Sequence, residues 1–217
     1  MRWHVDCFER LMLIQSAAKR SIGDVVEPRA GRGPSLFKLA YRLRGAFVAP
    51  VIVAAAVLAR HAHPHAGSLG AGAATFLAGW GGRMWAQRHL GYRLRQRMRL
   101  TTCGPYRLVR NPIYVANTLV VTGTTLLTGD PWLVAAAIGL CAVVYGLTVR
   151  HEEARLARWY GRRYLAYVHA TPRWLPSVPA PPDGVGCTCA RHWTEVALAE
   201  WHVPLVLVPV LVTLIIR

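Results

Sequence analysis

The chain has few acidic residues and little charge of any kind. Only 10 of its 217 residues are Asp or Glu, charged residues make up 17% of the chain, and hydrophobic residues make up 53%. An ordinary soluble domain carries about 25% charged residues, so this composition excludes that class and predicts a membrane protein. The formal net charge of +16 would by itself suggest a nucleic-acid partner. The positions of the basic residues decide between the two interpretations.

Most basic residues lie between apolar stretches, on one predicted side of a membrane. Five apolar stretches occur, at 45–59, 66–82, 113–128, 131–149 and 196–216. Of the 26 Lys and Arg, 9 precede the first stretch, 8 lie between the second and third, and 7 lie between the fourth and fifth. Only Arg60 and Arg217 fall on the other side if all five cross. This positive-inside pattern explains the charge by anionic lipid, makes a nucleic-acid partner unnecessary, and predicts a cytoplasmic N-terminus.

The five stretches predict an all-α fold, a polytopic helical membrane protein with about five transmembrane helices. A crossing helix needs roughly 20 apolar residues. Because 45–59 is shorter, four crossings with this stretch partly in the interface is the alternative. The predicted regions are a basic N-terminal lead with an interfacial helix at 1–44, a core at 45–176, a Pro/Gly linker at 177–192 and a C-terminal transmembrane helix at 193–217. Small residues in 66–82 allow close helix packing.

The chain also lacks recognisable sets of cysteine and histidine. Its five cysteines, at 7, 103, 141, 187 and 189, show no disulfide framework, and three or more lie on the predicted cytoplasmic side. We therefore expect free thiols. The histidines at 61, 63 and 65, and the group at 187, 189 and 192, are incomplete as zinc sites. We predict no metal.

The segment TTCGPYRLVRNPIYVANTLVV, at 101–121, carries two turn signals, Gly-Pro and Asn-Pro, directly before an apolar run. Asparagine can cap a helix and proline suits its first position, so we expect a membrane helix to begin at Pro112. A helix start offers unpaired N–H groups that bind a carboxylate or a phosphate. Arg107 and Arg110 stand beside it. The alternative is that both arginines only anchor the chain at lipid headgroups.

A second segment, VRHEEARLARWYGRRYLAYVHATPRWLP at 149–176, places two glutamates at the predicted membrane surface. Carboxylates are costly near anionic lipid unless they bind something. The alternative is that Glu152 and Glu153 pair with arginines at helical spacing on their own helix, which stabilises weakly.

Together the two segments resemble the family of isoprenylcysteine carboxyl methyltransferases and phospholipid methyltransferase-like membrane enzymes. The shared features are Gly-Pro-Tyr-Arg, Arg-x-Pro-x-Tyr, a Glu-Glu pair, an aromatic-Gly before Tyr-x-x-Tyr, and a Pro-Arg ending, in order, over residues 100–176. The resemblance implies a helical membrane bundle whose cytoplasmic segments cover an S-adenosylmethionine pocket, reached by a lipid-like substrate from the bilayer. The family's Arg-His-Pro is Arg110-Asn111-Pro112 here, and asparagine cannot relay a proton as imidazole can.

The resemblance and the chemistry of the cofactor together give a predicted site. The predicted cofactor-binding residues are Gly104, Pro105, Tyr106, Arg107, Arg110, Asn111, Pro112, Tyr114, Glu152, Glu153 and Tyr164, and the predicted catalytic residues are Arg150, Glu153 and Arg173. The helix start and its arginines would hold the cofactor carboxylate, a glutamate would accept from the ribose or ammonium group, and the tyrosines would form walls.

The acceptor is predicted less sharply than the cofactor. If it is a carboxylate, it is already ionised, and Arg150 or Arg173 need only orient it. An amine or a thiol would need a proton acceptor, which a glutamate could provide. A prenylated cysteine carboxylate, a phospholipid amine and a small thiol therefore stay open. The alternative outside the enzymes is a non-catalytic membrane scaffold of the same fold. The sequence leaves the oligomeric state open.

Overall fold

The computed structural model describes residues 49–61, 64–90, 100–176 and 191–216, and every regular element in these ranges is helical. The elements are α3 (Ala49–Ala59), α4 (Ala66–Leu90), α5 (Pro105–Leu108), α6 (Pro112–Leu126), α7 (Pro131–Tyr160), α8 (Arg162–Ala170), α9 (Trp193–Glu200), the 3₁₀ helix η2 (Val203–Leu207) and α10 (Val208–Ile215). The all-α prediction is confirmed for this part of the chain. The predicted lead at 1–44 and most of the predicted linker at 177–192 lie outside the described residues.

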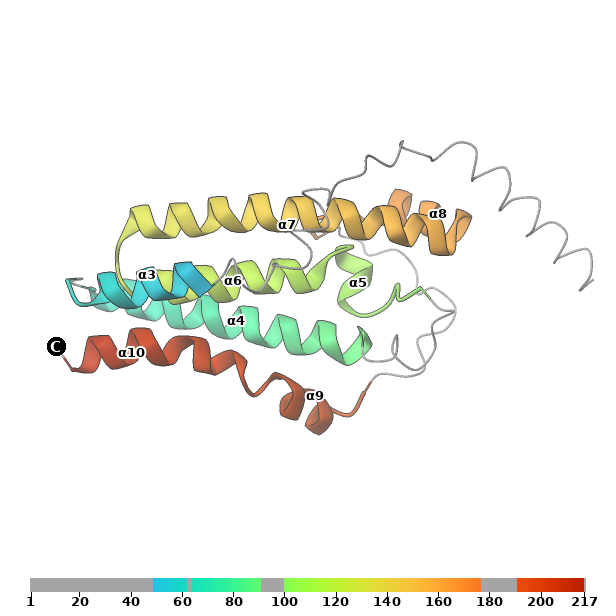
Figure 1. Cartoon of the computed structure of the whole chain (residues 1–217). Helices are drawn as coiled ribbons and strands as arrows, with labels where there is room; N and C mark the ends of the chain where they lie inside the picture. Colours follow the sequence, from blue (N-terminus) through green and yellow to red (C-terminus); the bar gives the residue numbers. More distant parts are fainter. Residues whose placement is uncertain (1–48, 62–63, 91–99, 177–190, 217) are drawn as a thin grey trace, which may run out of the picture.

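The long helices run along a common direction, with α6 packed between α4 and α7 (Figure 1). At one end the α7 helix continues into α8, and the short α5 lies beside them. Of the C-terminal elements, α9 packs on α4 and α10 packs on α3. The elements that carry the two sequence motifs therefore meet at the end of the bundle where α5 and α8 lie.

The α4–α6 interface is the tightest contact in the described bundle, because glycines face each other's backbones. A Cβ at Gly123 would lie 2.4 Å from the backbone nitrogen of Phe76, and one at Gly79 would lie 2.7 Å from that of Val120. Backbones this close exclude any larger residue. The small residues of 66–82 thus pack helix against helix, as the sequence predicts.

Helix α7 begins and ends at strong local signals. Asp130 caps it by accepting from the backbone N–H of Trp132 at 2.9 Å and of Leu133 at 3.3 Å, and proline occupies the first turn. It ends at Gly161, whose φ of 52° lies in the left-handed region that glycine tolerates. The 30-residue length carries Glu152 and Glu153 well past the apolar half of the helix.

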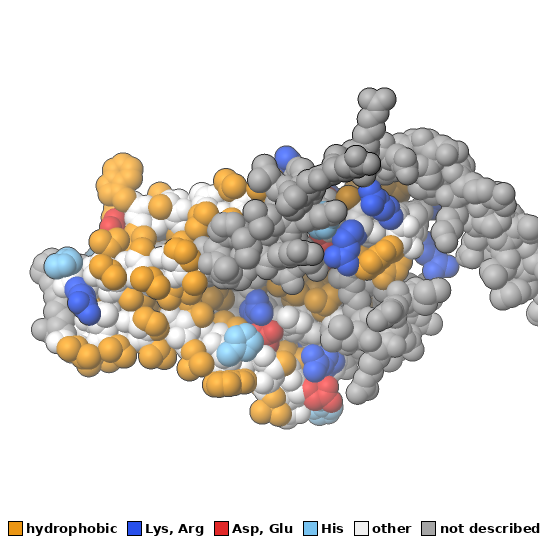
Figure 2. Space-filling model, viewed as in Figure 1, with side chains coloured by type: hydrophobic (Ala, Val, Ile, Leu, Met, Phe, Trp, Pro, Cys, Tyr) orange, Lys and Arg blue, Asp and Glu red, His pale blue; other side chains and the backbone are white. Residues whose placement is uncertain are grey.

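Within the described residues, two segments, Pro131–Tyr160 and Trp193–Ile215, are long and apolar enough to cross a membrane. Large hydrophobic side chains are exposed on them, among them Ile138, Val143 and Ile215. Figure 2 shows hydrophobic side chains over the half of the molecule that holds α3 and α10, whereas most Lys and Arg gather toward α8 and α9. These features suggest a membrane protein. Among the described helices, α4 is too polar, and α3 and α6 are too short, to cross a membrane by length and composition alone. The described residues therefore do not show the five predicted crossings.

The predicted single helix at 193–217 is broken into three elements in the structure. Pro204 and Pro209 lack the N–H that an α-helix needs, and the chain passes from α9 through η2 into α10 around them. The apolar run is therefore continuous in composition but not in hydrogen bonding. The first helical element ends at Glu200, which forms an ion pair with Arg83 of α4.

The expectation of free thiols is wrong for one described cysteine. Cys141 is free and buried, whereas Cys103 is disulfide-bonded. The expectation rested on sequence spacing and on the predicted compartment. Sequence spacing and compartment do not predict which cysteine side chains the fold brings within bonding distance.

Candidate active site

A glycine turn positions the first motif. Gly104 has a φ of 58°, and a Cβ there would lie 2.5 Å from the imidazole ring of His89 at the end of α4. Both the backbone conformation and the space therefore require glycine. Pro105 then starts the single turn α5, which buries Tyr106. Gly104 and Pro105 thus shape the site without lining its cavity.

Two hydrogen bonds to backbone carbonyls join the first motif to the second. The backbone N–H of Arg110 donates to the carbonyl of Pro172 at 2.8 Å. The buried hydroxyl of Tyr167 donates to the carbonyl of Tyr106 at 2.7 Å. Residues about 60 positions apart are thereby held against each other, so α8 and the chain after it form one wall above the start of α6.

Glu153 is the centre of an ion-pair network between the motifs. One carboxylate oxygen lies 3.2 Å from Nη1 of Arg110, and the other lies 2.5 Å from Nη2 of Arg173. Nδ2 of Asn111 lies 3.5 Å from the same carboxylate. Among the described residues, the partners of Glu153 thus come from other elements and not from arginines of its own helix. Asn111 is the N-cap residue of α6, but its side chain makes no capping bond and turns to Glu153 instead.

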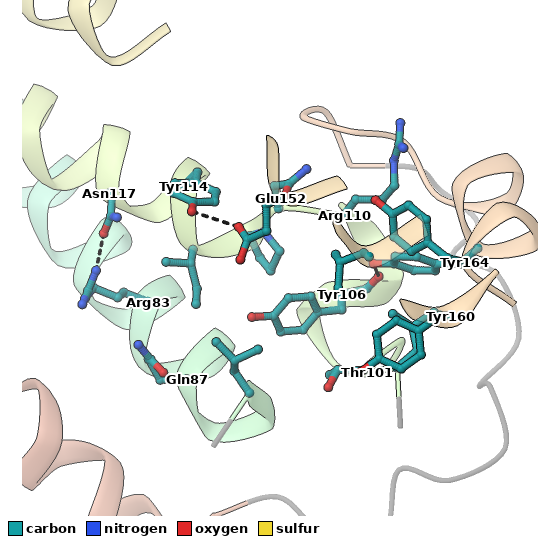
Figure 3. A pocket seen from close by; sticks show the side chains of 17 residues that line it. Arg83, Gln87, Thr101, Tyr106, Arg110, Tyr114, Asn117, Glu152, Tyr160 and Tyr164 are labelled. Atoms are coloured by element: carbon teal, nitrogen blue, oxygen red, sulfur yellow. Dashed lines mark hydrogen bonds between the residues drawn. The ribbon is translucent and has the colours of Figure 1, made fainter. Parts of the chain in front are cut away.

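A cavity of about 240 Å³ opens beside this network, between α4, α5, α6, α7 and α8. In Figure 3, Arg83 and Asn117 lie at one end, Arg110 and Tyr164 at the other, and Glu152 between them. The Tyr114 hydroxyl donates to Glu152 at 2.9 Å. The cavity is therefore polar at both ends, with a carboxylate held in its middle.

The tyrosines of α8 are held in their neutral form. Burial, reinforced by the negative charge of Glu153, raises the pKa of Tyr164 to about 12. Burial also raises the pKa of Tyr167, with Tyr164 adding to the effect. The hydrogen bond to Glu153 raises the pKa of Arg173, so that guanidinium stays charged. At neutral pH the wall formed by α8 presents hydroxyl donors and not phenolates.

Comparison with known proteins identifies the part of the chain that forms this site. Residues 70–163 match the family model described as phospholipid methyltransferase. Over this range, which is less than half of the chain, the protein is similar to phospholipid methyltransferases. The matched range covers α4 from Gly70 onward, α5, α6, α7 and the first residues of α8, which confirms the resemblance seen in the two motifs.

Two curated relatives match a similar length. The cobalt-zinc-cadmium resistance protein CzcN of Cupriavidus metallidurans is 32% identical over 96 residues, and the nickel-cobalt-cadmium resistance protein NccN of Alcaligenes xylosoxydans xylosoxydans is 30% identical over 95 residues. Each match covers 44% of this chain and 43% of the relative, so it spans less than half of either protein. No solved structure matches the chain significantly.

The structure brings most of the predicted site residues together. Seven of the predicted cofactor-binding residues line the cavity, namely Tyr106, Arg110, Asn111, Pro112, Tyr114, Glu152 and Tyr164. Glu153 and Arg173 lie behind this lining, joined to it through Arg110. Arg107 is half-buried on α5 outside the lining. The predicted residues thus form a cavity wall and a supporting layer.

Arg150 is placed away from this cavity. Its side chain is exposed, whereas Val149 and Glu153, one turn apart, face inward. Neighbouring positions on a helix point about 100° apart, so the residue after Val149 turns outward. The predicted role of Arg150 in orienting an acceptor therefore has no support in this geometry.

Sequence reasoning missed the residues that α4 and the C-terminal elements bring to the site. Arg83, Gln87 and Asn117 line the cavity, and Arg83 pairs with Glu200 of α9. Counting charges assigned Arg83 to a basic group facing lipid headgroups, and nothing in that count indicated an acidic partner more than 100 residues away. The isolated Glu200 beside an apolar run was the signal that could have found this pair.

Proposed function

We propose that the protein is an S-adenosylmethionine-dependent methyltransferase that acts on a lipid-like acceptor of the isoprenylcysteine carboxylate type at the cytoplasmic membrane face. The observation that carries the proposal is the polar cavity at the junction of the two motifs, in the part of the chain that is similar to phospholipid methyltransferases. Methyltransferases of this class need a cofactor pocket and an apolar route for the acceptor. The cavity and the exposed apolar helices supply these two features.

The residues around the cavity fit S-adenosylmethionine. Nε of Arg110 is buried and has no hydrogen-bond partner among the described residues, although its Nη1 is paired with Glu153. An unmatched buried donor beside the N-terminus of α6 suits the cofactor carboxylate. Glu152 offers acceptor oxygens for the ribose or ammonium group, and Tyr106 offers a flat ring for the adenine. Glu153 and Arg173 would keep Arg110 in place and need not touch the cofactor.

Bound S-adenosylmethionine would supply an electrophilic methyl group, whose transfer to an acceptor oxygen breaks the methyl–sulfur bond and leaves its electron pair on sulfur. The contribution of the protein is then alignment and exclusion of water. A carboxylate acceptor is ionised at neutral pH, so no residue has to remove a proton. Asparagine at position 111 is compatible with this reaction, because no proton relay through that side chain is required.

We also propose the membrane arrangement that the sequence predicts, with five crossings and a cytoplasmic N-terminus. The positive-inside distribution of basic residues supports it. The cavity would then open toward the cytoplasm at the end of the bundle that holds α5 and α8, which would cover the cofactor. The bilayer would deliver the acceptor from the apolar half.

The names of the two relatives assign them to resistance against cobalt, zinc, cadmium and nickel. For this chain we propose that the methyl transfer serves a similar resistance, by modifying a membrane lipid or a small thiol and not by holding metal. Among the described residues, no group of three or more His, Cys, Asp or Glu side chains is placed to bind a metal ion. A phospholipid amine is a further acceptor compatible with the domain.

The experiment is an assay of S-adenosylhomocysteine formation by purified protein in nanodiscs. The acceptors are N-acetyl-S-farnesyl-L-cysteine, phosphatidylethanolamine in the nanodisc lipid, and a small alkyl thiol. Turnover with one acceptor establishes the reaction and its class. Binding of S-adenosylmethionine without turnover on any of them would favour a scaffold that keeps the cofactor site, and the variant Asn111→His would then test whether the missing imidazole is the reason.

A further inference from the structure

A buried ion pair joins the C-terminal elements to the cavity. Nε of Arg83 on α4 donates to Oε2 of Glu200, and its Nη2 lies 3.4 Å from Oε1 of the same carboxylate. The side chain of Glu200 is 3% exposed and that of Arg83 is 19% exposed. A charged pair this deeply buried is costly to desolvate and stabilises the fold little in net terms. Such a pair is therefore more easily explained by what it holds in place.

The geometry of Arg83 leaves some of its N–H groups without an acceptor among the described residues. Glu200 takes the Nε–H and one N–H of Nη2, and Oδ1 of Asn117 takes one N–H of Nη1. A guanidinium has five N–H donors. One donor on each Nη is thus unassigned among the described residues, and Arg83 lines the cavity. A guanidinium N–H group of this kind can donate to an oxygen of a carboxylate or a phosphate.

The end of the cavity that holds Arg83 faces the apolar half of the bundle. Arg83 lies about two turns before the end of α4, and Asn117 lies more than one turn inside α6. Arg110 and Tyr164 lie at the opposite end of the cavity (Figure 3). A lipid-like molecule that enters from the bilayer would therefore meet Arg83 before it meets the end assigned to the cofactor.

The C-terminal elements hold this pair rigidly. The guanidinium of Arg88 stacks 4.5 Å above the ring of Trp193 at the start of α9, and its Nε donates to the carbonyl of Arg191 at 3.1 Å. The backbone N–H of Arg191 in turn donates to the carbonyl of Arg88 at 3.0 Å. Together with the Arg83–Glu200 pair, these contacts fix both ends of α9 to α4.

We propose that Arg83 binds an anionic oxygen of the methyl acceptor, a carboxylate or a phosphate, and that Glu200 is the positioning residue that orients Arg83 for this purpose. The inference rests on the proposed function and adds the chemical class of its acceptor. Glu200 lies outside the range matched by the family model, so this assignment belongs to the C-terminal elements of this chain.

The test measures ligand binding by calorimetry in nanodiscs that contain saturating S-adenosylhomocysteine, so that no turnover occurs. Two matched pairs of probes differ in one anionic group. The first is N-acetyl-S-farnesyl-L-cysteine and its methyl ester, which differ in the free carboxylate, and the second is a lysophosphatidic acid and the corresponding monoacylglycerol, which differ in the phosphate. The variants are Arg83→Gln, Glu200→Gln and the double variant, which leaves no unpaired charge. Glu195→Gln is the control, an exposed glutamate on the same helix.

We expect the native protein to bind the anionic member of one probe pair at least about tenfold more tightly, which is roughly 1.4 kcal/mol. The pair that shows the preference identifies the oxygen as carboxylate or phosphate. Arg83→Gln and the double variant should reduce the preference to less than about threefold, and Glu200→Gln should reduce it at least about threefold. Glu195→Gln should leave it unchanged.

Separate results overturn separate parts of the account. No preference in the native protein, or a preference that survives in Arg83→Gln, would overturn the role of Arg83. A preference unaffected by Glu200→Gln would overturn the positioning role of Glu200. Absence of S-adenosylhomocysteine binding by the native protein would instead contradict the proposed function. A dissociation constant for S-adenosylhomocysteine within about twofold of the native value shows that a variant is folded.

Discussion

Replacing Gly123 by alanine should force α4 and α6 apart. The new Cβ would lie 2.4 Å from the backbone nitrogen and 2.7 Å from the Cα of Phe76, whereas ordinary van der Waals contact begins at 3.4 Å. Because the contact is with backbone, no side chain can rotate away, and the helices must separate by roughly 1 Å. Overpacking of this kind costs about 1–3 kcal/mol. For a chain of this size, that corresponds to a Tm roughly 2–12 °C below that of a matched glycine-to-alanine variant without the contact.

The control is Gly81→Ala on α4, where a Cβ would meet nothing within 4 Å. Both changes gain helix propensity of about 0.8–1 kcal/mol, so their difference isolates the interhelical contact. The assay is thermal unfolding in one detergent, followed by circular dichroism. We expect Gly81→Ala to equal or exceed native stability and Gly123→Ala to fall below it. Equal stability of the two variants would refute the close approach of α4 and α6 on which the cavity walls depend.

Three further predictions concern the second motif. Glu153→Gln leaves two guanidinium groups without their carboxylate and should lower the unfolding free energy by about 1–3 kcal/mol in a denaturant titration. The cost is kept to this range because one of the two arginines, Arg173, is partly exposed. The control Glu195→Gln, at an exposed glutamate, should cost at most about 0.5 kcal/mol. Tyr167→Phe removes the bond to a backbone carbonyl and should cost about 0.5–1.5 kcal/mol, without changing the helix content seen by circular dichroism. The pKa of Tyr164 is raised from 10 to about 12, so its contribution to stability is present below pH 10 and is lost as pH rises to about 12. Tyr164→Phe should reduce the fall in unfolding free energy between pH 10 and about pH 12. An unchanged fall in the variant would contradict the raised pKa of Tyr164.

The local features of the fold could be predicted from the sequence because their causes are local. The Asn-Pro signal gives the start of α6 at Pro112, and the small residues of 66–82 pack as α4 against α6. The association of the two motifs was inferred from a family resemblance. Its physical cause, two hydrogen bonds and the ion pairs of Glu153, depends on long-range folding that no spacing encodes.

The remaining features depend on geometry that the sequence pattern does not contain. Arg150 was expected in the site and is exposed, because a helix turns neighbouring residues to different faces. Glu200 could be noticed as an acid beside an apolar run, but its partner Arg83 could not be chosen among 26 basic residues. The interruption of the last apolar segment follows from Pro204 and Pro209 and could have been predicted from them.

The central claim is tested most directly by calorimetry of S-adenosylmethionine binding to nanodisc-purified protein. The native chain is compared with Arg110→Ala, which removes a cavity residue, and with Arg163→Ala, which removes an exposed arginine on α8. The account predicts micromolar binding that Arg110→Ala weakens at least about tenfold and that Arg163→Ala leaves within about twofold. No binding by the native chain, or equal effects of the two substitutions, would contradict it and leave Arg110 as a structural ion-pair residue.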